Sequence, residues 1–333
     1  MPKRVATIGA GNWGTALSCL LAGMGHEVKL WAYEKEVVES IRAHRENPLF
    51  MRGIRLPESI LATCDLAEAL QGADIVLTVV PSHVCRALYE GMLEHLRPEM
   101  VLVSATKGLE TETRMRMSEV IQCVVGRRFA PRLAVLSGPS FAVEVARGDP
   151  TAVVVASQDR LAATLVQREF SSSTLRLYTS PDVVGVELGG AVKNVIAIAA
   201  GVVEGLQLGH NPTAALITRG LAEMTRLACA CGGKRETLAG LAGMGDLVLT
   251  CTGDLSRNRT VGIELGRGRK LAEIVGSTRM VAEGVKTTGA TVALAAEHHV
   301  EVPITNQVHR ILEGEVSPLD AIRQLMERTL KDE

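Results

Sequence analysis

The spacing of hydrophobic positions changes about halfway along the chain. In the first half, short apolar runs rich in branched residues alternate with segments whose apolar positions recur at helical spacing. The runs fall at residues 5–8, 28–31, 75–80, 101–104, 133–137 and 152–156, and the helical segments include residues 13–24, 83–95, 113–123 and 159–169. Continuous apolar runs suit strands buried on both faces of a parallel sheet. The alternation therefore predicts a doubly wound α/β fold.

The second half of the chain has helical spacing alone. Strand-like runs stop after Ser180 and Pro181. Helical patterns follow at residues 182–205, 212–231, 257–267, 283–298, 302–313 and 318–328. Pro181, Pro212 and Pro318 lie near predicted helix starts, where the missing N–H of proline costs no hydrogen bond. We therefore predict an α/β domain at residues 1–180 and an all-helical domain at residues 181–333.

Composition argues against several classes of function. The 333 residues are 47% hydrophobic and 22% charged, which is typical of a globular protein with a sizeable core. The formal net charge is −1 and there is no long basic stretch, so we expect no nucleic-acid binding. Residues 183–203 are apolar enough to suggest a membrane span, but Glu187, Lys193 and Asn194 are costly in lipid. We expect a buried helix there and no membrane insertion.

The seven cysteines follow neither a disulfide nor a metal pattern. Their number is odd and no Cys-x-x-Cys pair occurs. We expect reduced thiols, mostly as small core residues, in a cytoplasmic protein. No histidines and cysteines stand at metal-ligand spacing, so we expect no metal site.

A glycine pattern follows the first predicted strand directly. Gly9, Gly11 and Gly14 in GAGNWG end that strand and open a helix, which is the setting that the dinucleotide fingerprint of a Rossmann-type domain requires. Gly9 permits the tight turn, Gly11 lets the backbone approach a pyrophosphate, and Gly14 lets helix and strand pack closely. The helix N-terminus then offers free N–H groups to the phosphates. We therefore expect residues 1–180 to bind a nicotinamide dinucleotide.

The choice of cofactor depends on the end of the second strand. Glu34 lies twenty residues after Gly14, where a carboxylate accepts hydrogen bonds from the adenosine ribose and repels a 2′-phosphate. Lys35 offsets that repulsion, and Glu34 can equally well begin a solvated helix. The pattern favours NAD weakly and leaves NADP open.

The loops VVPS at residues 79–82 and SATKGLE at residues 104–110 follow strands and should reach the same edge of the sheet. Lys107, in SATKGLE, comes at the end of a buried strand and can bind phosphate or a carbonyl oxygen, although a solvated loop lysine is the alternative. In LSGPSFAVE, Gly138 permits close approach of the backbone. Ser140 can cap the next helix and donate to a ligand, and Glu144 suits the start of that helix.

Lys193 is the strongest candidate for proton transfer. It lies in VELGGAVKNVIAIAAG, a helix that is apolar on nearly every face, and burial lowers the pKa of a lysine. A lysine with a pKa near neutral pH can take a proton from an alcohol and return it to a carbonyl. The alternative is a lysine whose amine reaches the surface, where its pKa is not lowered. Asp246 is the one charge in LAGLAGMGDLVLT, and we expect it to pair with Lys193. The carboxylate in such a pair opposes the lowering of the Lys193 pKa by burial. The alternative for Asp246 is a loop aspartate that caps a helix.

A second phosphate-binding patch is predicted further on. Ser256 is a plausible N-cap, which places Arg257 and Asn258 in the first turn of a helix. A serine, an arginine and free helix N–H groups suit a phosphate, and Arg259 either joins them or faces solvent. A dinucleotide, a proton-transfer lysine and a second phosphate site together indicate a small phosphorylated alcohol as substrate.

These motifs resemble those of the bacterial NAD(P)-dependent glycerol-3-phosphate dehydrogenases. The resemblance covers nearly the whole chain. Its motifs are GAGNWGTALS at 9–18, VVPS at 79–82, ATKGLE at 105–110, SGPSFAVE at 137–144, VELGGAVKNVIAIAAG at 186–201, LAGMGDLVLTC at 241–251, SRNR at 256–259 and VAEGVKT at 281–287. It implies interconversion of sn-glycerol 3-phosphate and dihydroxyacetone phosphate, a role in glycerophospholipid synthesis, and a homodimer.

The resemblance also implies roles for individual residues. Lys193 matches the family's proton acceptor. The positions that match substrate contacts are Lys107, Gly138, Ser140, Lys193, Asp246, Ser256, Arg257 and Asn258. The positions that match cofactor contacts are Asn12, Trp13, Lys107, Ala142, Arg257, Val281 and Glu283, beside Gly9, Gly11, Gly14 and Glu34. Many members carry a basic residue at the position of Tyr33, so Tyr33 puts a preference for NADP in doubt.

The mechanism expected from the sequence is hydride transfer to C2 of the ketone in a cleft between the domains, with Lys193 as the acid. Two alternatives remain. Another two-domain dehydrogenase, such as a ketopantoate or hydroxyisobutyrate reductase, would act on a carboxylate instead of a phosphate. A non-catalytic NAD-sensing protein would have no use for a buried Lys193 and Asp246.

Overall fold

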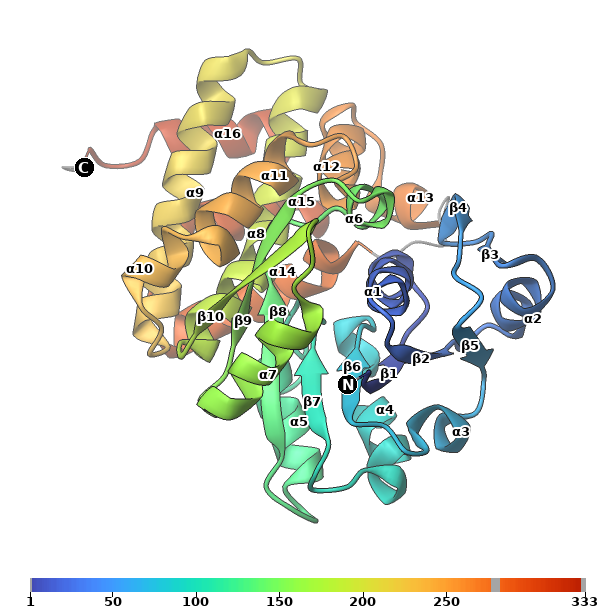
Figure 1. The fold of residues 1–333 in the computed structure, drawn as a ribbon. Helices are drawn as coiled ribbons and strands as arrows, with labels where there is room; N and C mark the ends of the chain where they lie inside the picture. Colours follow the sequence, from blue (N-terminus) through green and yellow to red (C-terminus); the bar gives the residue numbers. More distant parts are fainter. Residues whose placement is uncertain (1, 277–281, 331–333) are drawn as a thin grey trace. The chain divides into compact units, whose positions relative to one another are not determined.

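The computed structural model describes residues 2–276 and 282–330, in which an α/β region precedes a helical one (Figure 1). The chain forms two compact units. The first unit comprises Met1–Lys107 and Met115–Val186, and the second comprises Gly108–Arg114 and Glu187–Glu333. The short segment Gly108–Arg114, which follows Lys107, thus belongs with the helical unit. The predicted order of an α/β domain and a helical domain is confirmed, and the functional boundary after residue 180 stays a prediction.

The first unit is built on one eight-stranded sheet. Its strands are β1 (Arg4–Ile8), β2 (Glu27–Trp31), β5 (Ile60–Thr63), β6 (Ile75–Thr78), β7 (Val101–Ser104), β8 (Arg132–Ser137), β9 (Thr151–Ala156) and β10 (Leu175–Ser180). They lie in the order β10-β9-β8-β7-β6-β1-β2-β5, and the neighbours from β5 to β8 pair in parallel. The strand order reverses beside β1, as in a doubly wound sheet.

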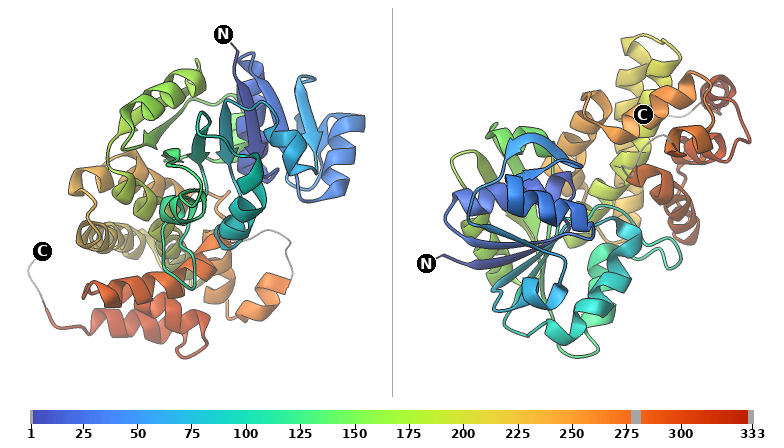
Figure 2. Two further views of the ribbon diagram at one scale, coloured as in Figure 1. Left: turned by 90° about the horizontal axis from the view of Figure 1, so that it is seen from below. Right: turned by 90° about the vertical axis from the view of Figure 1, so that its right-hand side faces the viewer.

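Helices cover both faces of this sheet because neighbouring residues of each strand point to opposite sides (Figure 2). On β1, Val5 packs into one core with α1 (Asn12–Gly23), α2 (Lys35–His44) and α7 (Arg160–Phe170). Ile8 packs into the other core with α3 (Leu66–Leu70), α4 (Cys85–Met92) and α5 (Met117–Val125). The remaining elements are the β3–β4 hairpin (Glu46–Asn47 and Met51–Arg55), the 3-10 turns η1 (Ser82–Val84) and η2 (Leu93–His95), and α6 (Ala142–Arg147).

One pair of strands departs from the predicted parallel sheet. β9 runs antiparallel to β8, and β10 follows it in parallel. A parallel neighbour needs a crossover that returns the chain to the opposite end of the sheet. The link from β8 to β9 contains only α6, which ends at Gly148 in the left-handed region, and it brings the chain back at the same end. The parallel pairing expected for residues 152–156 was therefore wrong at this pair.

Several predicted boundaries also move. The strand predicted at residues 75–80 ends at Thr78, and the helix predicted at 83–95 divides into η1, α4 and η2. The helix predicted at 113–123 begins at Met117, because Arg114 takes a left-handed conformation with φ of 61°. Glu119 then accepts a hydrogen bond from the Arg116 backbone N–H at 2.9 Å and so fixes the start of α5.

The second unit is helical. Its helices are α8 (Val183–Gly205), which begins in the first unit, α9 (His210–Ala230), α10 (Arg235–Leu238), the π-helical turn η3 (Leu241–Gly245), α11 (Asp246–Thr252), α12 (Arg257–Gly266), α13 (Leu271–Gly276), α14 (Glu283–Glu297), α15 (Pro303–Leu312) and α16 (Pro318–Met326). α8 is long and apolar enough to cross a membrane, but 89% of its most apolar window is buried inside the protein. It is therefore a core helix, as predicted.

Candidate active site

The glycine turn after β1 has the geometry that its sequence predicts. Gly9 has φ of 116°, and its N–H donates to the Trp31 carbonyl at 3.0 Å. A Cβ on Gly9 would overlap the carbonyl oxygen of Val79, and a Cβ on Gly14 would overlap that of Gly9. Only glycine fits at these two positions, because the backbone segments touch.

The same turn fits the phosphates of a dinucleotide. A Cβ on Gly11 would meet no described atom within 4 Å, so the backbone is open to a ligand there. Gly11 is the N-cap of α1 and no side chain caps that helix, which leaves N–H groups of its first turn for an anion. Among the residues that the structure describes, the buried Oδ1 of Asn12 has no hydrogen-bond partner. Trp13 is partly buried against the core beside it.

The end of β2 leaves a carboxylate where a ribose is expected. Glu34 is the N-cap residue of α2, and its side chain does not cap the helix. Tyr33 is 82% exposed, so it forms part of no core. α2 does start here, as the alternative interpretation of Glu34 required.

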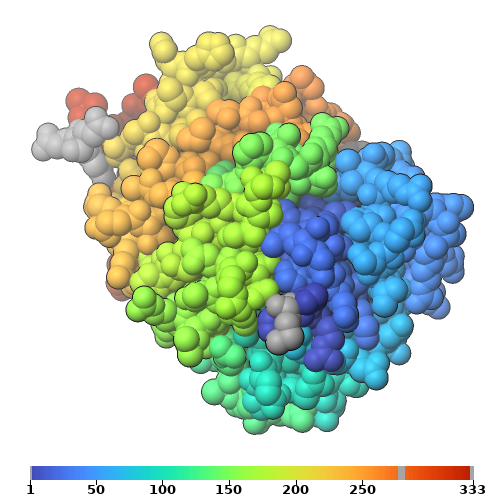
Figure 3. Space-filling view, in the orientation of Figure 1, coloured from blue at the N-terminus to red at the C-terminus, as the bar shows by residue number. Residues whose placement is uncertain are grey.

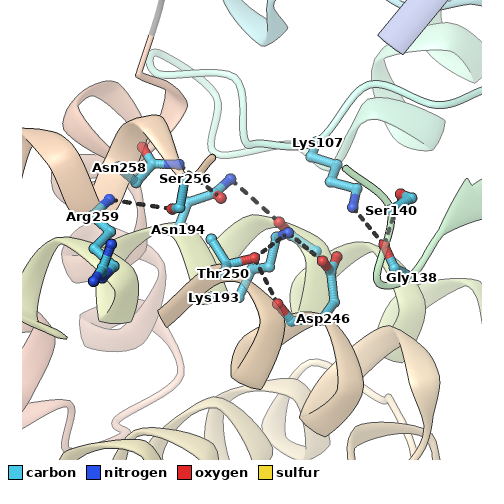
Figure 4. Close-up of polar contacts among 11 residues, drawn as sticks. Lys107, Gly138, Ser140, Lys193, Asn194, Asp246, Thr250, Ser256, Asn258 and Arg259 are labelled. Atoms are coloured by element: carbon cyan, nitrogen blue, oxygen red, sulfur yellow. Dashed lines mark hydrogen bonds and ion pairs between the residues drawn. The ribbon is translucent and has the colours of Figure 1, made fainter. Parts of the chain in front are cut away.

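A polar cluster lies where the neighbouring strands β7 and β8 end. Lys107 donates from Nζ to the carbonyl oxygen of Gly138 at 3.1 Å, and Ser140 donates from Oγ to the same oxygen at 3.0 Å (Figure 4). The N-cap of α6 is Phe141, so the predicted cap by Ser140 is wrong: its hydroxyl bonds backward, to Gly138. Ala142 opens α6, which packs against α1, the helix of the glycine turn.

Lys193 is buried on α8 and pairs with Asp246, as the sequence predicted. Lys193 is 6% exposed and Asp246 is 1% exposed. The ammonium of Lys193 donates to Oδ1 of Asp246 and, at 2.8 Å, to Oγ1 of Thr250 (Figure 4). The Thr250 hydroxyl donates in turn to the backbone carbonyl of Asp246 at 2.6 Å. Two residues one turn apart on α11 therefore hold the amine inside the protein, which excludes a lysine that reaches the surface.

Side-chain amides join three helices next to this cluster. Asn258 donates from Nδ2 to Oδ1 of Asn194 at 2.9 Å, which links α12 to α8. Oδ1 of Asn258 accepts the Gly284 backbone N–H at 2.9 Å, which links α12 to α14. Both functional ends of the Asn258 amide are thus engaged within the protein.

The residues of the predicted phosphate patch lie at the start of α12. Ser256 is its N-cap and accepts the Arg259 backbone N–H at 3.2 Å, which places Arg257 in the first turn. Arg257 is exposed, yet desolvation by neighbouring protein atoms holds its pKa below the usual value, and the nearby Glu283 acts in the opposite direction. Arg259 pairs with Glu204 at 2.6 Å and Asp254 at 3.0 Å, so carboxylates balance its charge.

Two predicted cofactor positions, Val281 and Glu283, stand two residues apart in the sequence. Glu283 is the first residue of α14, where a carboxylate suits the helix dipole. Val281 lies outside the described residues.

Comparisons with known proteins agree with this geometry. Sequence models described as NAD-dependent glycerol-3-phosphate dehydrogenase N-terminus and C-terminus match residues 4–163 and 182–323. A protein of Koribacter versatilis named glycerol-3-phosphate dehydrogenase (NAD(P)+) is 62% identical over 98% of this chain and 97% of its own. The chain belongs to the NAD-dependent glycerol-3-phosphate dehydrogenase family.

Other members of the glycerol-3-phosphate dehydrogenase family extend the match. The Acidobacterium capsulatum protein of the same name is 57% identical over 99% of this chain and 100% of its own. The crystal structure of glycerol-3-phosphate dehydrogenase from Coxiella burnetii superposes with a TM-score of 0.93 at 42% identity, and covers 98% of this chain and 99% of that one. The carboxylate-reductase and NAD-sensing alternatives are therefore not favoured.

One residue of the candidate site, Thr250, was not predicted from the sequence. Thr250 contacts the Lys193 amine, yet residues 238–250 were not predicted to form a helix. The spacing from Asp246 to Thr250 is i to i+4, which puts both side chains on one face as soon as a helix is assumed. The glycines before Asp246 hid that helix, because η3 and α11 continue one another through Gly245.

Proposed function

We propose that the protein reduces dihydroxyacetone phosphate to sn-glycerol 3-phosphate with NAD(P)H, and catalyses the reverse reaction. In the forward direction the ketone takes up a hydride and a proton, and NAD(P)H becomes NAD(P)+. The observation that carries this proposal is the buried Lys193 amine, held by Asp246 and Thr250 in a chain that also has a dinucleotide turn. The names of relatives at 57–62% identity support the choice of substrate.

Lys193 acts as the acid in this proposal. When bound, the reduced nicotinamide would supply a hydride to C2 of the ketone, which leaves negative charge on the oxygen at C2. Lys193, in its ammonium form, gives the proton to the alkoxide oxygen and is left as an amine. The Asp246 carboxylate and the Thr250 hydroxyl fix the direction of the Nζ–H bonds, since both accept from this nitrogen. An ammonium whose N–H bonds are held in place stabilises the developing charge without having to reorient.

The first turn of α12 binds the substrate phosphate in this proposal. Arg257 is exposed, so an anion can reach its guanidinium, and neighbouring protein atoms desolvate it enough to lower its pKa, a cost that a bound phosphate would offset. The N–H groups at the start of this ten-residue helix add positive potential. We propose that Lys107, Gly138, Ser140, Ser256 and Asn258 complete the contacts with the substrate, as the family resemblance implies.

We propose NAD as the preferred cofactor and keep NADP possible. The Glu34 carboxylate at the end of β2 accepts from a ribose diol and repels a 2′-phosphate. Tyr33 supplies no positive charge to offset that repulsion. Trp13, Ala142, Val281 and Glu283 are proposed cofactor contacts on the strength of the family resemblance.

The family resemblance is also the basis of three wider proposals. The product would supply glycerol 3-phosphate for glycerophospholipid synthesis, the enzyme would act in the cytoplasm, and it would form a homodimer. Light scattering on the purified protein tests the last of these, and a monomeric mass at assay concentration would refute it.

One spectrophotometric experiment tests the proposed reaction. The oxidation of NADH and of NADPH is followed separately, with dihydroxyacetone phosphate, with ketopantoate as the carboxylate control, and with no ketone. We expect oxidation only with dihydroxyacetone phosphate, and a higher kcat/KM for NADH than for NADPH. Oxidation with the carboxylate alone, or with neither ketone, contradicts the proposal. A higher kcat/KM for NADPH contradicts only the assignment of Glu34.

A further inference from the structure

The β3–β4 hairpin interrupts the alternation of strands and helices between α2 and β5. It carries Asn47, which is fully buried although it stands at the end of a two-residue strand. The hairpin lies against α1, and the space-filling view shows its lighter blue surface beside the dark blue of α1 (Figure 3). A buried asparagine in a surface hairpin needs hydrogen-bond partners, because an unpaired amide is costly away from water.

Those partners belong to the glycine turn. Nδ2 of Asn47 donates to the Ala10 carbonyl at 2.8 Å and to Oγ1 of Thr15 at 2.9 Å. The Thr15 hydroxyl donates to the same Ala10 carbonyl at 3.0 Å, and Oδ1 of Asn47 accepts the Phe50 backbone N–H at 3.2 Å. Exchange of the two ends of the amide would set an oxygen against the Ala10 oxygen and an NH₂ against the Phe50 N–H. The network therefore fixes the orientation of the amide.

Two donors on the Ala10 carbonyl determine where the next N–H points. The peptide between Ala10 and Gly11 is planar and trans, so its C=O and N–H lie in opposite directions. Asn47 and Thr15 hold the C=O toward the buried side of the turn. The Gly11 N–H consequently points away from the buried side of the turn. Gly11 is also the residue where an added Cβ would meet no described atom within 4 Å.

We propose that Asn47 is a positioning residue for the cofactor. It holds the Ala10–Gly11 peptide in the orientation that presents the Gly11 N–H to the dinucleotide pyrophosphate. The inference rests on the proposed dinucleotide site and adds to it a residue far from the glycine motif in sequence. Asn47 touches neither the cofactor nor the substrate, and it acts through the backbone of the turn.

The test replaces Asn47 by leucine, which has a similar size and no charge. Aspartate is unsuitable because its charge would repel the pyrophosphate directly. NADH affinity is measured by fluorescence titration, and the kinetic constants for both substrates and the Tm are measured alongside. We expect Asn47→Leu to weaken NADH binding about tenfold, the order of one charge-assisted hydrogen bond. The KM for dihydroxyacetone phosphate and the kcat at saturating NADH should stay within about twofold, since these report on later steps.

Matched variants separate positioning from general loss of stability. Ser157→Ala removes a buried hydroxyl that donates to the Leu133 carbonyl at 2.6 Å, at another place in the same unit. It should lower the Tm and leave NADH affinity unchanged. Thr15→Val should weaken NADH binding by a smaller factor than Asn47→Leu, whereas Thr15→Ser, which keeps the hydroxyl, should bind as the unchanged protein does. ADP-ribose should lose as much affinity as NADH in each variant, because both carry the pyrophosphate.

Two results would overturn the inference. One is a folded Asn47→Leu protein that binds NADH with unchanged affinity. The other is a Thr15→Val protein with unchanged affinity, which decides the matter if Asn47→Leu does not fold. Failure of the proposed reaction is distinguishable, since the unchanged protein would then bind NADH without turning over dihydroxyacetone phosphate. If it did not bind NADH at all, both the dinucleotide site and this inference would fall.

Discussion

Replacement of Lys193 by methionine is the sharpest test of the proposed chemistry. Methionine keeps the length and apolar stem of the side chain and removes the amine. A positioned general acid contributes about 10²- to 10⁴-fold to rate, so we expect kcat to fall by at least that factor. At about 1.36 kcal/mol per tenfold, the loss corresponds to about 3–5 kcal/mol of transition-state stabilisation.

The same replacement also has a stability cost, which follows from the burial of its partner. Asp246 is 1% exposed and would be left without the cation that it faces. Removal of one member of a buried ion pair costs about 3–5 kcal/mol, against a total stability of about 5–15 kcal/mol. We therefore expect a folded protein with a markedly lower Tm, and NADH affinity within a few-fold of the original.

Lys193→Arg separates the two effects. Arginine keeps the pair with Asp246 but stays protonated at all working pH values, so it cannot pass a proton to the substrate. The Tm of Lys193→Arg should be higher than the Tm of Lys193→Met and closer to the Tm of the unchanged protein. The kcat of Lys193→Arg should be as low as the kcat of Lys193→Met. Thr250→Val, which leaves the ion pair intact, should lose less activity than either.

The assay is NADH oxidation with dihydroxyacetone phosphate, with NADH binding and thermal unfolding measured on the same preparations. Turnover of Lys193→Met within tenfold of the unchanged protein would remove Lys193 from the chemistry. A kcat of Lys193→Arg close to normal would show that the charge of residue 193 matters and its proton does not.

Three further predictions follow from the same structure. Gly14→Ala should abolish NADH binding, measured by fluorescence, because the added Cβ overlaps the Gly9 carbonyl; unchanged affinity would mean that the turn is not the cofactor site. Arg257→Gln should raise the KM for dihydroxyacetone phosphate by about tenfold or more, the order of one charge-assisted phosphate contact, and an unchanged KM would place the phosphate elsewhere. Burial raises the pKa of Glu223 above its ordinary value of 4.5, although its carboxylate accepts the Thr305 N–H at 2.8 Å. A raised pKa in the folded state means that the free energy of unfolding increases as the pH falls through that pKa. The Tm of the unchanged protein should therefore rise relative to the Tm of Glu223→Gln between neutral pH and pH 4.5. A constant Tm difference between the two proteins would contradict the burial argument.

Local sequence patterns predicted the elements that they specify by themselves. The continuous apolar runs became β1, β2, β6, β7, β8 and β9, and the long apolar helix became α8. The edge strands β5 and β10 were missed: alternate positions of β10 face solvent, so no continuous apolar run appears there, and the apolar run of β5 is only three residues long. The reversed direction of β9 could not be predicted either, since it depends on where the α6 connection returns the chain.

The sequence by itself determined the glycine turn, the buried helix around Lys193 and the helix start at Ser256, because each depends on residues that are close neighbours in the chain. Tertiary structure alone decided that Thr250 shares the Lys193 amine, that Arg259 is balanced by Glu204, and that Asn47 reaches the Ala10 carbonyl. These contacts join residues more than thirty positions apart. Each forms because packing brings polar groups from distant parts of the chain within hydrogen-bond reach as it removes them from water, and no local pattern records which groups those will be.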